Sequence, residues 1–180
     1  MNKSLHYAAI AGIISIILLV PLIIFEVMKV LKVLTGIFLI AYVLLYVLAA
    51  VLDLIFTWGF VIIGKKAKIR LLINTSYILI VSSILYTAYI IPSFLFPALE
   101  KYNLIVTIFT LLLLGAVGLA FSIALLRLKK LFPIANVAGI LGIIMSASFL
   151  TIIFSFIGLL LIVPFYIVTT MLLFRAAKKF

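Results

Sequence analysis

The stretch that decides the fold runs from Leu34 to Gly64 and reads LTGIFLIAYVLLYVLAAVLDLIFTWGFVIIG. It carries a single charged residue, Asp53, and is followed by a basic run made of Lys65, Lys66, Lys68 and Arg70. The hydrocarbon core of a bilayer is about 30 Å thick and takes about 20 helical residues. The stretch therefore predicts a membrane-spanning helix whose basic end lies at one surface and whose Asp53 lies near mid-membrane.

The composition of the whole chain predicts the same class of protein. Of its 180 residues 69% are hydrophobic and 9% are charged, and the mean hydropathy is +1.61. A soluble domain of this length needs a polar surface, and the chain has too few polar residues to form one. The surrounding solvent therefore has to be lipid. Because every backbone amide must be paired inside lipid and no alternating strand pattern occurs, we expect an all-α, polytopic transmembrane helical bundle that forms one domain over residues 1–180.

The other apolar runs predict the remaining helices. Three of them are long enough to span once, and they cover Tyr7 to Phe25, Leu71 to Ile91 and Leu104 to Leu126. The last run, residues 137–174, would form a helix of roughly 57 Å, which is nearly twice the hydrocarbon thickness. We expect two short helices that meet around Ser155 to Gly158. The alternative is one span plus a re-entrant segment, which gives five spans in total.

The positions of the basic residues favour six helices. With six, eleven of the 14 Lys and Arg residues lie on one side, whereas five spans divide them eight to six. By the positive-inside rule we expect six helices, arranged as three hairpins, with both termini cytoplasmic. Because the basic residues cluster at segment ends, we expect them to meet anionic lipid headgroups and not nucleic acid. The minority side carries Lys29, Lys32 and Lys101.

The residues that most enzymes use are scarce. The chain has no cysteine and one histidine, His6, whereas a catalytic zinc site takes three protein ligands and a haem needs axial ligands. A serine nucleophile lacks an intramembrane histidine or lysine as its base. The two acids besides Asp53 are Glu26 and Glu100, which we place in outer loops. We therefore expect no catalytic residue, no metal site, no cofactor and no enzymatic activity.

Asp53 is the one costly residue, because a charge at mid-membrane costs at least about 2.5–3.5 kcal/mol on insertion scales. We expect its side chain to face the bundle interior and to lie near hydroxyls of the third predicted helix. The candidate midplane polar site consists of Asp53, Ser82, Ser83 and Tyr86. Two interpretations stay open: the site binds a proton or cation, or Asp53 is a hydrogen-bonded packing residue.

Residues counted twelve positions inward from the basic boundaries lie at a common depth. This level holds mostly small or polar residues, which favours a polar layer at the midplane: Ser15, Asp53, Ser82, Gly115 and, counted from Asn136 at the start of the fifth predicted helix, Ser148. In the last helix the count from Arg175 reaches Val163, beside Pro164.

Small residues recur every four positions in the fourth and fifth predicted helices. Small side chains let membrane helices approach closely. We therefore expect one face to pack against the other, the first made of Ala116, Ala120 and Ala124 and the second of Ala138, Gly142 and Ser146.

The last third of the chain, LLRLKKLFPIANVAGILGIIMSASFLTIIFSFIGLLLIVPFYIVTTMLLFRAAKKF, resembles uncharacterised archaeal polytopic membrane protein families of unknown function. The resemblance covers residues 125–180 and implies the plasma membrane of a prokaryote as the location. Such families have no assigned catalytic residues, so the resemblance transfers no site.

Two function classes follow from these features. The lack of catalytic chemistry and the small-residue faces favour a structural or accessory subunit of a membrane complex, bound to other membrane subunits or to copies of itself. Asp53 and the polar third helix favour the alternative, a small transporter or channel with a midplane polar site.

Overall fold

The structure of the chain is a computed structural model that describes residues 2–31 and 33–180, without the side chains of Val30, Leu95, Pro97 and Glu100. In these ranges the chain forms helices and no strand, so the all-α prediction is confirmed. Lys32, which entered the count of basic residues above, and the side chain of Glu100 lie outside the described residues. The elements are α1 (Lys3–Val30), α2 (Ile37–Ala67), α3 (Arg70–Leu95), the single turn α4 (Pro97–Glu100), α5 (Asn103–Arg127), the 3-10 turn η1 (Leu128–Lys130), α6 (Ile134–Leu150) and α7 (Ser155–Lys179).

Local sequence explains several helix ends. The side chain of Asn2 accepts a hydrogen bond from the backbone N–H of Leu5 (3.2 Å), which caps α1. Lys68 takes a left-handed conformation (φ 56°) at the end of α2, so that α3 begins two residues later. The predicted break in the last apolar run falls at residues 151–154, just before the expected position, and Gly158 lies inside α7.

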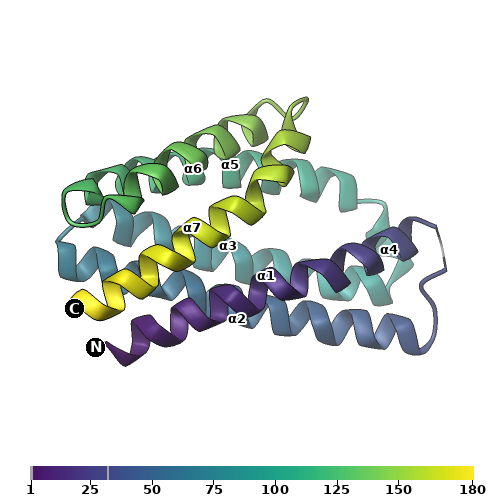
Figure 1. The fold of residues 1–180 in the computed structure, drawn as a ribbon. Helices are drawn as coiled ribbons and strands as arrows, with labels where there is room; N and C mark the ends of the chain where they lie inside the picture. Colours follow the sequence, from purple (N-terminus) through teal and green to yellow (C-terminus); the bar gives the residue numbers. More distant parts are fainter. Residues whose placement is uncertain (1, 32) are drawn as a thin grey trace.

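The six long helices form a closed ring (Figure 1). Each helix packs against its neighbours in the chain, so that α1 and α2, α3 and α5, and α6 and α7 form the three expected hairpins. The last helix, α7, returns to pack against α1 and closes the ring. Such a ring has an interior that all six helices can line.

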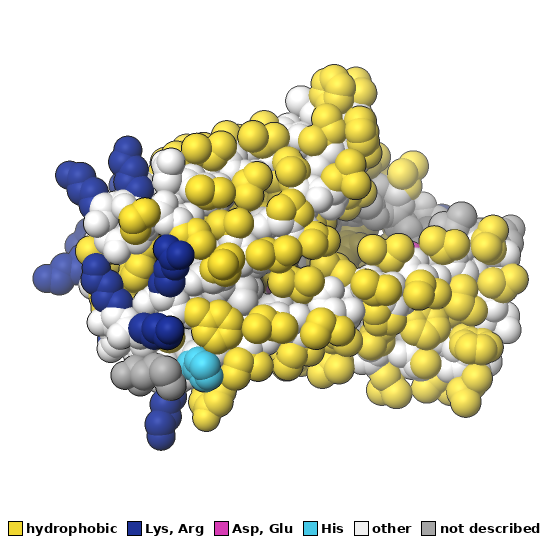
Figure 2. All heavy atoms as spheres, viewed as in Figure 1, with side chains coloured by type: hydrophobic (Ala, Val, Ile, Leu, Met, Phe, Trp, Pro, Cys, Tyr) yellow, Lys and Arg dark blue, Asp and Glu magenta, His cyan; other side chains and the backbone are white. Residues whose placement is uncertain are grey.

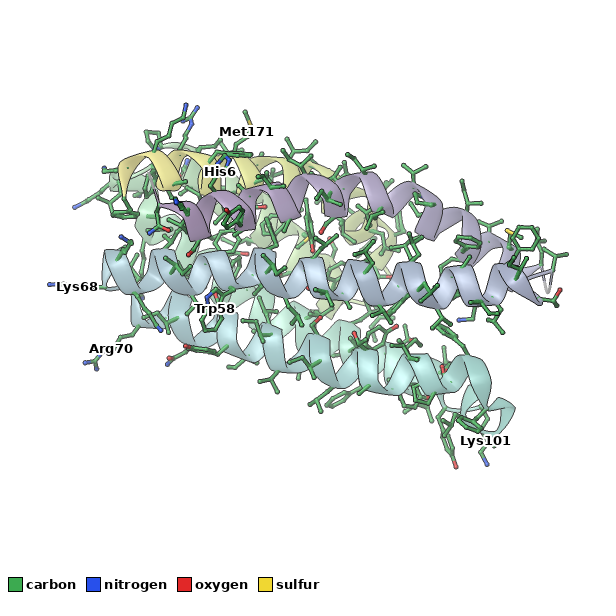
Figure 3. All side chains as sticks on the ribbon, turned by 90° about the horizontal axis from the view of Figure 1, so that it is seen from below. His6, Trp58, Lys68, Arg70, Lys101 and Met171 are labelled. Carbon is green, nitrogen blue, oxygen red and sulfur yellow. The ribbon has the colours of Figure 1, made fainter. Side chains whose placement is uncertain are left out.

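Both chain termini lie at one end of the ring (Figure 1). The backbone N–H of Asn2 donates a hydrogen bond to the carbonyl of Ala177 (2.8 Å). Lys and Arg side chains gather at this end (Figure 2), which we call the basic end. Lys68 and Arg70 lie there, whereas Lys101 lies at the opposite end, the far end (Figure 3). The chain therefore crosses the length of the ring an even number of times.

Five of the helices, all except α6, are long and apolar enough to cross a membrane, by length and composition. They indicate a multi-pass membrane protein. With 17 residues, α6 is about 26 Å long, whereas α1 with 28 residues is about 42 Å long. The α6–α7 turn consequently stops short of the far end (Figure 1).

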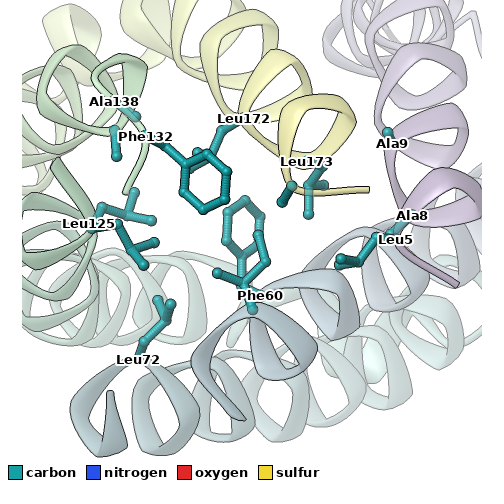
Figure 4. Packing of buried hydrophobic residues seen from close by; sticks show 14 of the residues in the cluster. Leu5, Ala8, Ala9, Phe60, Leu72, Leu125, Phe132, Ala138, Leu172 and Leu173 are labelled. Atoms are coloured by element: carbon teal, nitrogen blue, oxygen red, sulfur yellow. The ribbon is translucent and has the colours of Figure 1, made fainter. Parts of the chain in front are cut away.

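Packing is tightest at the basic end. A cluster of buried apolar side chains from all six long helices fills the ring there, including Phe60, Phe132 and Leu173 (Figure 4). At Gly59 a Cβ atom would come within 2.7 Å of the Ala8 Cβ and 2.8 Å of the Leu173 side chain. The ring is therefore sealed by close packing at this end.

The most extensive helix contact is between α5 and α6, and small residues make it. On α6 the expected face of Ala138, Gly142 and Ser146 is buried, and a Cβ on Gly142 would come within 3.1 Å of the Ser122 Cβ of α5.

The α5 side of that contact differs from the expectation. Ala116 is exposed, so the face of Ala116, Ala120 and Ala124 does not lie against α6 as a unit. One residue turns an α-helix by about 100°, so Ala116 points away from the side on which its buried neighbour Gly115 lies. The side of α5 that meets α6 is made by Gly115, Gly118 and Ser122.

Labelling of single cysteines tests the placement of the chain ends, because the native sequence has no cysteine. With Lys68→Cys, Lys178→Cys and Lys101→Cys introduced one at a time, a membrane-impermeant maleimide should modify residues 68 and 178 from the same side of the membrane. Residue 101 should be modified from the other side. Labelling of residues 101 and 178 from one side would contradict the arrangement.

Leucine substitutions test which faces of α5 and α6 pack. We expect Gly142→Leu to lower the free energy of unfolding by about 1–3 kcal/mol, because the contact has no room for a larger side chain. Ala147→Leu, on the exposed side of the same helix, should change it by less than about 0.5 kcal/mol. Ala116→Leu should likewise change the free energy of unfolding by less than about 0.5 kcal/mol. A large loss of stability for Ala116→Leu, measured by thermal unfolding, would show that the face of Ala116, Ala120 and Ala124 is the packed one.

Candidate functional site

The ring encloses a cavity of about 470 Å³ next to the packed basic end. All six long helices contribute residues to its wall. Most of the wall is apolar, and of the residues that the structure describes Asp53 is the only charged one in it. The polar lining residues are Ser15, Tyr46, Asp53, Thr57, Ser82, Ser83, Tyr86, Thr87, Thr110, Ser122, Ser146 and Tyr166.

Asp53 lies in the middle of α2 and is held from two other helices. The Tyr166 hydroxyl of α7 donates a hydrogen bond to Asp53 Oδ1. The Ser83 Oγ of α3 donates to Asp53 Oδ2 at 3.5 Å, a long hydrogen bond. The carboxyl group is therefore kept inside the ring, where it connects α2 to α3 and, across the ring, to α7.

Aromatic side chains form the floor of the cavity toward the basic end. The Tyr166 ring stacks on Phe56, with centroids 4.8 Å apart and an angle of 13° between the rings. Phe56 packs edge-on against Phe60 (5.4 Å), and Phe60 packs in the same way against Phe121 (5.2 Å). Phe56, Phe60 and Phe121 belong to the apolar cluster, so this series, which we call the aromatic floor, is the side of that cluster that faces Asp53.

The cavity wall is incomplete between α1 and α7. Because α6 is short, α7 begins well before the far end, and the outer half of α1 has no α7 segment beside it. Leu159, near the start of α7, lines the cavity and is also 57% exposed. Figure 2 shows a recess on this face between the α6–α7 turn and the outer half of α1. The cavity therefore opens sideways.

A second polar group lies toward the far end. The hydroxyl of Tyr42, a fully buried residue, donates a hydrogen bond to Glu26, and Lys29 Nζ lies 4.0 Å from a carboxylate oxygen of Glu26. Lys29 also lies over the Phe94 ring, 4.6 Å from its centroid. Glu26 was expected in an outer loop, but α1 continues to Val30, so Glu26 lies within the helix.

The structure brings all four residues of the expected polar site, Asp53, Ser82, Ser83 and Tyr86, to the wall of one cavity. Of these, Ser83 contacts the carboxyl group, whereas Ser82 donates to the carbonyl of Ile78 in its own helix (2.8 Å). Ser15 of the expected midplane layer also lines the cavity. Gly115 and Ser148 are not among the lining residues.

Sequence reasoning missed Tyr166, the closest partner of Asp53. The count from the basic boundary reached Val163 and Pro164 and passed over the tyrosine one turn further on. Tyr166 is one of only three polar residues between Gly158 and Arg175, the others being Thr169 and Thr170, and this scarcity was a usable signal.

Two buried hydroxyls on residues of the cavity wall make no hydrogen bond within the described part of the chain. Among the described residues, Ser15 Oγ and Ser146 Oγ are buried and have no hydrogen-bond partner, although buried polar atoms are usually paired. Ser146 is only 1% exposed and comes from α6, on the side of the ring opposite α2. Both oxygens are fully buried, so a ligand in the cavity reaches them only if their side chains rotate.

Comparisons of the chain with protein-family models, with curated proteins and with solved structures found no match. Its function is therefore inferred from the cavity: a single carboxyl group, several hydroxyls and many aromatic rings around one space. Such a mostly apolar wall with a few placed polar groups is typical of small-molecule sites.

A double-mutant cycle tests the contact between Asp53 and Tyr166. Asp53→Leu leaves the Tyr166 hydroxyl without its acceptor, and Tyr166→Phe removes the same hydrogen bond from the other side. The double variant Asp53→Leu/Tyr166→Phe should therefore lose less free energy of unfolding than the sum of the losses in the two single variants. We expect a coupling of about 0.6–1.7 kcal/mol, as for hydrogen bonds between membrane helices. The measurement is thermal or denaturant unfolding in detergent.

The control for this cycle combines Asp53→Leu with Tyr77→Phe. Tyr77 is exposed and packs on Trp58, away from the cavity wall. These two changes should be additive. A coupling between Asp53 and Tyr166 no larger than that of the control pair would show that the hydrogen bond does not form.

Proposed function

We propose that the chain is a small membrane transporter whose substrate binds in the central cavity. The observation that supports this best is a cavity of about 470 Å³, walled by all six long helices, with the carboxyl group of Asp53 in it. Its volume falls within the range of about 300–1,000 Å³ found for ligand pockets. A polar site enclosed by helices near mid-membrane is where many transporters bind their substrates.

The different packing at the two ends supports transport by alternating access. The aromatic floor and the apolar cluster close the route to the basic end, while the other half of the cavity is open between α1 and α7. Under this proposal, the arrangement seen here is one of the two conformations that such a transporter needs. In the second conformation the helices that pack around Gly59 and Phe60 have to move apart.

We also propose an orientation and a location. By the positive-inside rule the basic end, with both termini, faces the cytoplasm, and its Lys and Arg side chains bind anionic headgroups. A prokaryotic plasma membrane is the proposed membrane. Neither enzymatic chemistry, a cofactor nor nucleic acid is part of this proposal.

An accessory subunit of a membrane complex, or a homo-oligomer, is the second candidate. Ala116 on α5 is a small residue on an exposed face, where a helix of another subunit can approach closely. In that case the cavity has no ligand of its own. Purification from native membranes separates the two candidates, because a subunit brings its partners in fixed stoichiometry.

Filling the cavity tests the transport proposal. Ala50→Trp places a large ring inside the cavity, whereas the control Ala147→Trp adds the same ring on an exposed face of α6. We expect small molecules from a mixed library of cations, anions and neutral compounds to raise the melting temperature of the wild type and of Ala147→Trp. Ala50→Trp should weaken this binding at least tenfold and abolish uptake of the same compounds into proteoliposomes.

The opposite result is equally clear. If no compound binds the wild-type protein, and the chain is isolated with other subunits in fixed proportion, it is an accessory subunit and the transport proposal is wrong.

A further inference from the structure

We propose that the substrate of this cavity is an amphipathic organic cation with a single positive charge, which pairs with the Asp53 carboxylate. The proposal rests on the transport function proposed above and names its substrate class. Three independent features of the cavity support it: its charge, its aromatic wall and its sideways opening.

The charge of the cavity favours a cation. Within residues 2–31 and 33–180, Asp53 is the only charged residue found in the wall, and no Lys, Arg or His among them lines the cavity. The chain carries a net charge of +11, but its basic residues lie at the helix ends. An ionised carboxylate away from water needs a positive partner, and the protein supplies none here. A monovalent cationic ligand neutralises Asp53, whereas an anion would be repelled by it.

The aromatic wall favours an organic cation and not a bare metal ion. Aromatic faces attract organic cations, and eight aromatic residues line the cavity. Calcium takes six to eight oxygen ligands, and magnesium needs octahedral coordination, but the wall offers one carboxyl group. No group of three His, Cys, Asp or Glu residues suited to a metal ion occurs in the described part of the chain. The aromatic lining residues are Tyr46, Phe56, Phe60, Tyr86, Phe121, Phe149, Phe165 and Tyr166.

The sideways opening favours an amphipathic substrate over a strongly hydrated one. The lining residues on its two sides are Leu19 and Leu22 of α1 and Leu159 and Ile162 of α7, which are all apolar. Leu159 is 57% exposed at a surface that faces lipid in the proposed orientation. A molecule with an apolar body can pass from the hydrocarbon phase between these side chains and place its charge at Asp53.

Binding of such a cation depends on pH through Asp53. The other titratable groups in the wall are Tyr46 on α2, Tyr86 on α3 and Tyr166 on α7, while α1, α5 and α6 contribute none. The cation pairs with the ionised carboxylate, so a proton on Asp53 competes with it. The affinity for a cation should therefore fall as the pH is lowered, and the affinity for a neutral ligand should not.

Three probes of similar shape and different charge test the proposal: tetraphenylphosphonium, neutral triphenylphosphine oxide and the anion tetraphenylborate. Equilibrium binding is measured on the purified full chain in detergent. We expect the cation to bind at least tenfold more tightly than the neutral compound and the anion not to bind. Lowering the pH should weaken the binding of the cation and leave the binding of the neutral compound unchanged. This comparison tests the role of the carboxylate without any substitution.

Two carboxyl-to-amide variants localise the effect. Asp53→Asn should weaken tetraphenylphosphonium binding at least tenfold, remove its pH dependence and leave binding of the neutral compound unchanged, which also shows that the variant is folded. Glu26→Gln, which changes a carboxyl group outside the cavity, should leave cation binding as in the wild type.

The outcomes separate this inference from the transport proposal. One outcome is that the neutral compound binds as tightly as the cation, with an affinity that changes neither with pH nor in Asp53→Asn but is lost in Ala50→Trp. In that case the cavity binds small molecules, and the proposed cation class is wrong. If none of the three probes binds while other library compounds do, the substrate class is again wrong. If nothing in the library binds either, the transport proposal itself fails.

Discussion

A carboxyl group in the middle of a membrane helix has to be kept away from hydrocarbon, and the rest of the structure depends on how this is done. Asp53 of α2 accepts hydrogen bonds from Ser83 of α3 and from Tyr166 of α7. The second bond links α2 to the last helix, which also packs against α1 and closes the ring. The same contact places the Tyr166 ring on Phe56, at the floor of the cavity. The contacts that keep the Asp53 carboxyl group inside the ring are thus the same contacts that form the floor of the cavity.

Much of the fold could be predicted from the sequence, because in a membrane the length of an apolar run and the positions of charges are strong constraints. The 38 residues from Val137 to Phe174 are too long for one span, and they form two helices. The basic residues predicted that both termini lie at one end, as they do. The cost of an intramembrane acid also indicated that Asp53 faces inward, and its carboxyl contacts Ser83.

What could not be predicted is which face of each helix points inward. In water an apolar stripe marks the core, but in lipid an apolar side chain is equally well placed inside or outside, so periodicity carries little information. The four-residue spacing from Ala116 therefore joined an exposed residue, Ala116, to a buried one, Ala124, while Gly115 and Gly118 meet α6. Tyr166 was missed because its contact with Asp53 joins residues 113 positions apart, through a ring closure that no local pattern shows.

The most direct test of a laterally accessible carboxyl group inside the bundle is its reaction with dicyclohexylcarbodiimide, an apolar reagent that modifies carboxylic acids from within the membrane. The protein is treated in its membrane and the modified residues are identified by mass spectrometry of its peptides. The account predicts modification of Asp53, reduced in Ala50→Trp and unchanged in Ala147→Trp. Modification confined to Glu26 and Glu100, with Asp53 unreacted, would contradict it.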